Sequence, residues 1–218
     1  MNPIDQNAIN ALYLADWQSA NLWLLILGFV VAFALAFAVG ANDCANSFGT
    51  AVGSGVMSFK TACIIGAICE TSGAIFLSSN TIKTVTTGVI NVEEYQSVYN
   101  ETTGFWTDPY GVPSGNDTLN PETELLIGEI STIVGSAIWQ LIATRLGWPV
   151  SATHSTVGGL VGFSLLARGP AGINWRKIVS IVIAWFVSPV SAGLATVALY
   201  YPIRKYVVLG DNGTYSDP

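Results

Sequence analysis

Five apolar segments alternate with polar stretches along this chain. The first, residues 22–39 ("LWLLILGFVVAFALAFAV"), has no charged residue. At about 1.5 Å of rise per residue it nearly crosses a hydrocarbon core about 30 Å thick. The others cover about 61–79, 125–144, 149–167 and 177–201, the last interrupted by Pro189. The pattern predicts an all-α integral membrane protein with several spans.

The polar stretches divide the chain into three parts. Residues 1–21 form an N-terminal segment, 22–205 a transmembrane part with an extramembrane loop at 80–124, and 206–218 a polar tail. Sequons at Asn100 and Asn116 make these two residues glycosylation candidates and favour a lumenal or extracellular loop. The 8 Lys and Arg divide equally between the two sides if all five segments span, so they decide no orientation. The fourth segment, rich in Gly, Ser and Thr, is the one we expect to be broken or re-entrant.

Composition supports the membrane assignment and excludes other classes. Hydrophobic residues make up 51% of the chain and charged residues 10%, against about 25% in ordinary soluble domains. The net charge is −6 and no basic run occurs, so we expect no nucleic-acid partner. The 3 cysteines are odd in number and irregularly spaced, which argues against a disulfide framework or a zinc site. We expect them to be small buried hydrophobic residues.

The stretch "GANDCANSFGTAVGSG", residues 40–55, follows the first apolar segment. Gly40 can break the preceding helix. On a helix, one face would carry five polar side chains: Asn42, Asp43, Asn46, Ser47 and Thr50. They could be packing and capping residues. A carboxylate and carboxamides at membrane depth are costly, however, and usually mark an ion or substrate path, which is the reading we favour.

A second polar stretch, "WPVSATHSTVGG", covers residues 148–159. Pro149 suits the first turn of a helix. That turn would then hold Ser151, Thr153, His154, Ser155 and Thr156. Free N–H groups, the positive end of the helix dipole and several hydroxyls make a site for an oxyanion such as phosphate or sulfate. The alternative is that the hydroxyls bond backbone carbonyls and His154 is a buried neutral histidine.

Acidic residues lie in the apolar segments without basic partners. Glu70 and Glu129 are within or near the ends of the second and third segments, and Asp43 joins them. Buried unpaired carboxylates either protonate or bind cations, and oxygen ligands suit hard cations such as sodium. Glu129 could instead be an interfacial acid at a helix start. Cations between the acids would help to hold an anion, which is the logic of cation-coupled anion uptake.

Enzymatic signatures are missing from the sequence. The chain has 1 His, no G-x-S-x-G elbow and no H-E-x-x-H motif. Intramembrane aspartyl proteolysis needs two Asp, and Asp43 is the single Asp in a candidate segment. We therefore predict that the protein is not an enzyme and needs no cofactor other than coupling ions.

The motifs, taken together, resemble those of a known family. "GANDCANSFGTAVGSG", "CETSG" at 69–73, "GEISTIVGSAIWQLIATRLGWPVSATHSTVGGLVGFSL" at 128–165 and "WFVSPVSAG" at 185–193 follow one another in family order. The chain is similar to the sodium-dependent inorganic phosphate transporters, the PiT or phosphate permease family, over about residues 20–205. The resemblance implies two inverted repeats, each with one GAND signature and one P-V-S-x-T-H element. The substrate site would lie near mid-membrane, where the repeats meet.

The resemblance also implies roles for individual residues. Phosphate would be bound by Asp43, Asn46, Ser151, Thr153 and Ser155, and sodium by Asp43 and Asn46. Cation coupling would involve Asn42, Asp43, Glu70 and Glu129. The roles of His154, Ser47 and Thr50 stay unassigned.

This chain holds one copy of each motif, so we expect half of a family transporter. A fragment is the favoured explanation; a partial gene model and a half-size subunit are the alternatives. A site would then need a missing second repeat or a second copy of the chain. The resemblance implies sodium-coupled symport of inorganic phosphate, and we expect it at the plasma membrane. Proton coupling, a non-transporting membrane scaffold or receptor, and a channel-like pore are the alternatives.

Overall fold

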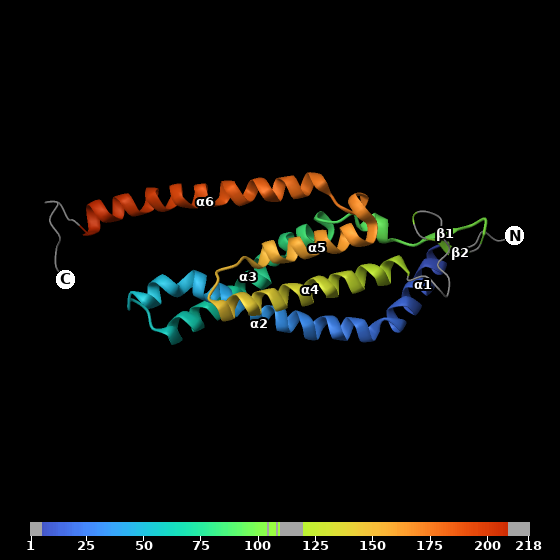
Figure 1. The fold of residues 1–218 in the computed structure, drawn as a ribbon, viewed down its shortest axis with the longest axis horizontal. Coiled ribbons are helices and arrows are strands. Elements are labelled where there is room, and N and C mark those ends of the chain that lie inside the picture. Colours follow the sequence, from blue (N-terminus) through green and yellow to red (C-terminus); the bar gives the residue numbers. More distant parts are fainter. Residues whose placement is uncertain (1–5, 104, 108, 110–119, 209–218) are drawn as a thin grey trace. The chain divides into compact units, whose positions relative to one another are not determined.

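The computed structural model of the chain describes residues 6–103, 105–107, 109 and 120–208. Two compact units are present, Met1–Asn174 and Trp175–Pro218, and the division falls inside the predicted transmembrane part, 22–205. The helices are α1 (Gln6–Ala20), α2 (Leu22–Gly53), α3 (Phe59–Gly88), α4 (Pro121–Leu146), α5 (Ala152–Arg168) and α6 (Trp175–Ile203) (Figure 1). The prediction of an all-α membrane protein is confirmed.

Short elements connect these helices. They are the 3₁₀ turns η1 (Val92–Tyr95) and η2 (Gly169–Gly172), the π-helical turn η3 (Arg204–Val208) and the strands β1 (Val98–Asn100) and β2 (Phe105–Thr107). The strands form an antiparallel hairpin in which Tyr99 pairs with Trp106. This hairpin lies in the predicted extramembrane loop, although α3 continues to Gly88, beyond the predicted start of that loop.

In the described residues, four helical stretches are long and apolar enough to cross a membrane. They are Leu22–Gly53, Phe59–Ser79, Pro121–Leu146 and Trp175–Val207. The fourth predicted segment is not among them, because α5 has 17 residues and at about 1.5 Å per residue is shorter than the hydrocarbon core. Between α4 and α5 the chain leaves the helix at Gly147, whose φ of 70° ends α4. α5 itself is unbroken, so the expected break is not found within the fourth segment, and its re-entrant character stays a prediction.

Two predicted interruptions are wrong. Gly40 lies inside α2, which runs unbroken for 32 residues, and Pro189 lies inside α6. The physical reason is the same for both. Glycine costs about 1 kcal/mol in a helix interior and proline about 3 kcal/mol. Breaking the helix in lipid would leave several backbone groups without hydrogen bonds, which is more costly.

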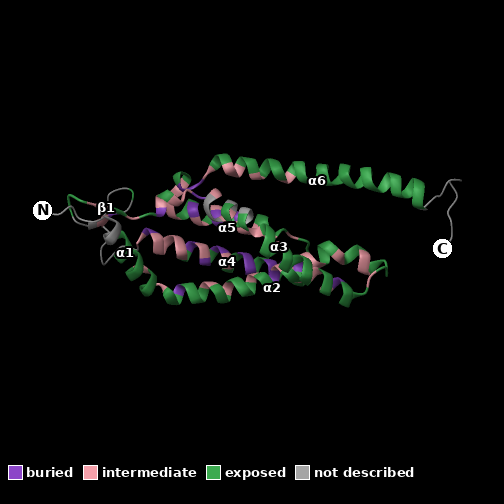
Figure 2. Ribbon diagram, turned by 180° about the vertical axis from the view of Figure 1, so that it is seen from behind, coloured by how far each residue is buried: buried purple, intermediate pink, exposed green. Residues whose placement is uncertain are grey.

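In the first unit, α2 and α4 run parallel and α5 returns antiparallel to α4 (Figure 1). Small residues allow the helices to approach closely. A Cβ atom added at Gly28 would lie 3.6 Å from Ile130, and one at Gly159 would lie 2.9 Å from Thr132. The Phe163 ring occupies the space beside Gly128. Figure 2 shows the buried residues gathered along α4, which is covered by both neighbours.

The N-terminal segment, predicted only as polar, forms α1 and packs on the loop. The Tyr13 ring stacks on Trp106 with centroids 4.1 Å apart, and Trp17 Nε1 donates to Thr123 Oγ1 at 2.9 Å. The Tyr13 hydroxyl lies 3.1 Å from Glu122 Oε2, to which it donates. Burial raises the pKa of Tyr13 above its ordinary value, and the neighbouring Glu122 charge adds to this rise.

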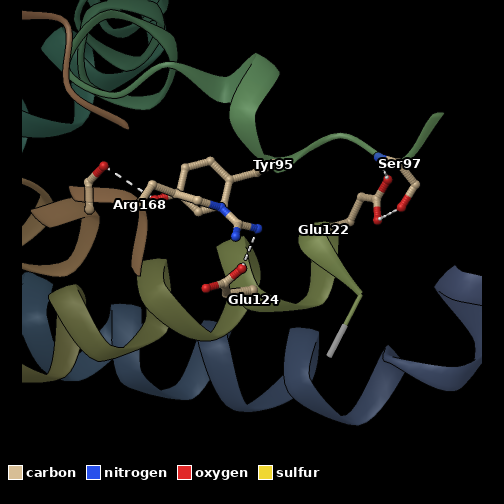
Figure 3. A network of polar contacts seen from close by, with 6 residues as sticks. Tyr95, Ser97, Glu122, Glu124 and Arg168 are labelled. Atoms are coloured by element: carbon tan, nitrogen blue, oxygen red, sulfur yellow. Dashed lines mark hydrogen bonds and ion pairs between the residues drawn. The ribbon is translucent and has the colours of Figure 1, made fainter. Parts of the chain in front are cut away.

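Figure 3 shows further polar contacts at the start of α4. Glu122 accepts hydrogen bonds from Ser97 N at 2.6 Å and Ser97 Oγ at 2.8 Å. Arg168, at the end of α5, forms an ion pair with Glu124 at 2.5 Å and lies over the Tyr95 ring. We call the contacts of Tyr13, Ser97, Glu122, Glu124 and Arg168 the extramembrane clasp. The clasp ties α1, the loop and the end of α5 to one end of α4.

The second unit consists of α6 and η3 in the described residues. No α6 residue is buried, and large apolar side chains such as Phe186, Leu194 and Leu199 are exposed. A helix that is apolar over most of its surface is typical of a membrane span.

Candidate functional site

Asn42 joins the two polar stretches that the sequence singled out. The side chain is 5% exposed, and its Nδ2 donates to the Trp148 carbonyl at 3.0 Å and to Thr144 Oγ1 at 3.1 Å. Its Oδ1 accepts from Val150 N at 3.2 Å and from Asn46 Nδ2 at 3.4 Å. The carboxamide therefore uses both donors and both lone pairs. Asn42 holds α2 against the turn before α5, and its predicted part in cation coupling stays a prediction.

Asn46 lies beside this junction. A cavity of about 300 Å³ opens there, lined by Asn42, Asn46, Thr144, Trp148 and Pro149 among others. The Asn46 amide also lies 3.4 Å from Asp43 Oδ1, to which it donates. One side chain thus bonds the buried asparagine and the acid, and it lines the same cavity as the turn. Asn46 and Asp43 lie together, as a shared role in binding requires.

Asp43 faces a second cavity, between α2 and α3. Its volume is about 620 Å³, and its lining includes Asp43, Cys44, Ser47, Cys63, Glu70 and Thr71. The structure therefore brings the two acids Asp43 and Glu70 to one cavity. The Ser47 and Thr71 hydroxyls also line this cavity, and the rest of its lining is mostly apolar. Oxygen ligands of this kind suit a hard cation. Thr50, one turn further along α2, is exposed and is not among the residues that line it.

The second polar stretch begins α5, but not at the predicted residue. Ser151 is the N-cap: its Oγ accepts from His154 N at 3.3 Å, and its carbonyl accepts from Ser155 Oγ at 2.9 Å. The placement of Pro149 in the first helical turn is wrong, because α5 starts at Ala152. The N–H of Val150 bonds Asn42 instead of following a helical path, and serine is the stronger cap. Ser151, Thr153 and His154 are exposed at this helix start.

Gln140 is a functional candidate that the sequence reasoning missed. The side chain is fully buried, and its Nε2 donates to Ser155 Oγ at 3.4 Å. Its Oε1 has no hydrogen-bond partner among the described residues, and neither have Ser136 Oγ and Thr132 Oγ1. These residues lie four apart on the face of α4 toward α5, where a cavity of about 500 Å³ is lined by Thr132, Ser136 and Ser155. A glutamine inside an apolar segment was the available signal.

Glu129 does not join the other acids. It lies 15 residues before Thr144 on α4, which is roughly 22 Å along the helix axis. The Asn42 junction is at the Thr144 end of α4, and Glu129 is toward the opposite end. If Glu129 takes part in cation coupling, as predicted, it does so away from the cavity that Asp43 and Glu70 share.

One glycosylation candidate can be placed. Asn100 ends β1, and its Oδ1 accepts from Thr102 N at 2.9 Å in a tight turn of the loop. Asn116 lies outside the described residues.

Membrane-length helices with acids, amides and hydroxyls meeting inside them define a multi-pass membrane protein of the transporter type. Comparison with known families gives the same class: residues 39–215 match the profile of the phosphate transporter family. The match covers more than half of the chain, and this chain belongs to the phosphate transporter family. The resemblance seen in the motifs is confirmed.

Individual relatives agree with this assignment. The chain is 44% identical over 188 residues to sodium-dependent phosphate transporter 1 of Mus musculus, covering 86% of this chain and 24% of the relative. It is 46% identical over 187 residues to sodium-dependent phosphate transporter 2 of Felis catus, covering 86% and 25%. A solved structure titled "The sodium-dependent phosphate transporter" superimposes with a TM-score of 0.71 at 35% identity, covering 87% of this chain and 41% of that one. The chain spans about a quarter of the length of these curated relatives.

Proposed function

We propose that this chain forms part of a sodium-coupled symporter of inorganic phosphate in the plasma membrane. The observation that carries the proposal is the Asn42 junction, in which Asn42 bonds Trp148 and Val150, directly before the α5 N-cap. This contact holds the acid-bearing helix α2 beside a hydroxyl-rich helix start. An anion site and a cation site then lie next to each other.

Phosphate is held at the start of α5 in this proposal. The helix end offers free N–H groups and a positive dipole end, and Ser151 and Thr153 add exposed hydroxyls. Asn46 lies across the small cavity from the turn that leads into α5 and contributes an amide donor. Ser155 is the inner member of the set, because it lies 3.4 Å from Gln140 Nε2. No basic side chain is needed for such a site.

Sodium is held by the α2–α3 cavity in this proposal. Asp43 and Glu70 supply carboxylate oxygens there, and Ser47 supplies a hydroxyl. A cation between the carboxylates lowers their mutual repulsion and the repulsion that Asp43 exerts on phosphate. Since Asn46 contacts both Asp43 and Asn42, it connects the cation site to the anion site.

A complete site needs a second set of the same motifs. This chain carries one GAND stretch and one P-V-S-x-T-H stretch, and both lie in the first unit. We propose that the second set comes from a further repeat in a longer protein or from a second copy of this chain. Inverted repeats that meet at a midplane site are a recurring transporter design.

The test is a chimera. The chain replaces the matched segment of the Mus musculus relative, and radiolabelled phosphate uptake is measured in cells with sodium or potassium outside. We expect saturable uptake in sodium and background uptake in potassium, with the unmodified relative as the control. Three results would contradict the proposal in different ways. Uptake driven by a proton gradient alone indicates proton coupling, normal surface display without uptake indicates a scaffold or receptor, and unsaturable flux indicates a pore.

A further inference from the structure

Two cysteines from different helices meet at the cavity that contains Asp43. Cys44 on α2 and Cys63 on α3 both line this cavity, one from each of the two helices that enclose it. The helices are close at this level, because a Cβ atom added at Gly66 would lie 3.3 Å from the Phe48 ring. Nothing in the sequence pairs these cysteines, since 18 residues separate them along the two helices.

The sulfur atoms of Cys44 and Cys63 are accessible to a small reagent. Cys44 and Cys63 are each partly exposed, and neither is in a disulfide. The cavity of about 620 Å³ also has hydroxyl and carboxylate groups, so a small polar reagent can reach the sulfur atoms. Cys69 differs from them, because it is exposed and is not among the residues that line the cavity. The chain therefore contains a matched control for reactivity that depends on pairing.

We propose that Cys44 and Cys63 are a modification site, at which hydrogen peroxide forms a reversible disulfide between α2 and α3. In the first step one thiol sulfur attacks a peroxide oxygen, an S–O bond forms, the O–O bond breaks and water leaves. In the second step the other thiol attacks the sulfenic sulfur, the S–S bond forms, the S–O bond breaks and a second water leaves. The two thiols lose two electrons and two protons, and hydrogen peroxide is reduced to water.

The disulfide would fasten α2 to α3 directly beside Asp43 and Glu70. Any effect on transport rests on the proposed function, because it requires that this cavity hold the coupling cation. The cross-link itself does not, since the thiols can be counted without measuring transport. Failure of the two proposals is therefore distinguishable.

The experiment uses the 218-residue chain in lipid vesicles, which are treated with hydrogen peroxide. The protein is then denatured, and its free thiols are labelled with a maleimide and counted. We expect the 3 titratable thiols to fall to a single one, and dithiothreitol to restore them. Trypsin locates the bond, because no Lys or Arg precedes Lys60 and the next is Lys83. Cys44 is then in peptide 1–60, and Cys63 is in peptide 61–83 with Cys69. The two peptides should be linked within chains that still migrate as monomers.

Single variants decide the pairing. Cys69→Ser should keep the reducible link between the two peptides, and Cys63→Ser should lose it. The proposal is overturned if Cys69→Ser retains both remaining thiols after peroxide. It is also overturned if Cys63→Ser still forms the link, since Cys69 would then be the partner of Cys44.

Discussion

The extramembrane clasp and the Asn42 junction lie toward opposite ends of α4 and use polar groups in different ways. In the clasp, the Glu122 carboxylate accepts from Ser97 N, Ser97 Oγ and Tyr13 Oη. At the junction, Asn42 is equally saturated, but along α4 from the junction toward the clasp, buried oxygens of Gln140, Ser136 and Thr132 have no partner among the described residues. Each such oxygen costs about 1–3 kcal/mol. The comparison indicates that the clasp stabilises the fold, whereas the junction region keeps polar capacity for a ligand.

The largest expected effect on stability comes from Asn42→Ala. The substitution removes a buried carboxamide with four hydrogen bonds and leaves the part-buried Val150 N–H and Trp148 carbonyl without their partner, so we expect a loss of about 3 kcal/mol in the free energy of unfolding. Unfolding in mixed micelles measures it. Asn46→Ala is the matched control, because Asn46 is exposed and its bonds are long, at 3.4 Å. Equal losses for the two variants would contradict the structural role of Asn42.

A smaller effect is expected from Arg168→Ala in the clasp. The Arg168 and Glu124 side chains are 15% and 26% exposed, so water still screens the Glu124 carboxylate that the variant leaves behind. We expect a loss of about 1–2 kcal/mol, which includes the contact with the Tyr95 ring. The same unfolding assay applies, with Arg145→Ala as an exposed control on α4, the helix that carries Glu124. A loss equal to or larger than that of Asn42→Ala would contradict the expected ranking of the two regions.

The smallest effect is expected from Tyr13→Phe. The variant keeps the ring that stacks on Trp106 and removes the hydroxyl that donates to Glu122, so we expect a loss of about 1 kcal/mol.

This Tyr13 contribution also depends on pH. Burial raises the pKa of Tyr13, so the native state holds the phenol proton more tightly than the unfolded chain does. The contribution is therefore complete below the ordinary value of 10.0 and is lost as pH rises through the raised pKa. The difference between wild type and Tyr13→Phe should shrink in that range. A difference that grows with pH would contradict the assigned direction.

Much of the fold could be predicted from the sequence because lipid imposes one strong rule. Long apolar stretches must satisfy their backbone internally, so α2, α3, α4 and α6 follow from hydropathy. The same rule explains why Gly40 does not end α2. Segment α1 was missed because its helix is stabilised by packing on Trp106, a contact more than 90 residues away in the sequence.

The candidate site could be predicted in its parts but not in its assembly. The residue types of the GAND stretch and of the α5 start indicated an ion and an oxyanion. The partners of Asn42 outside α2 could not be predicted, since they lie 102 to 108 residues away. For the same reason the sequence could not separate Glu129 from Asp43, or bring Cys44 beside Cys63. Residue type gives the chemistry, whereas tertiary packing decides which groups share a cavity.

The central claim is that the junction region binds ligands and the clasp does not. Sodium-driven phosphate uptake by the chimera, compared for Asp43→Asn and Glu122→Gln at matched surface expression, tests it most directly. We expect Asp43→Asn to reduce uptake to background, because the cation loses a carboxylate. We expect Glu122→Gln to leave uptake per surface molecule and its sodium dependence unchanged. Wild-type uptake with unchanged sodium dependence in Asp43→Asn would contradict the account.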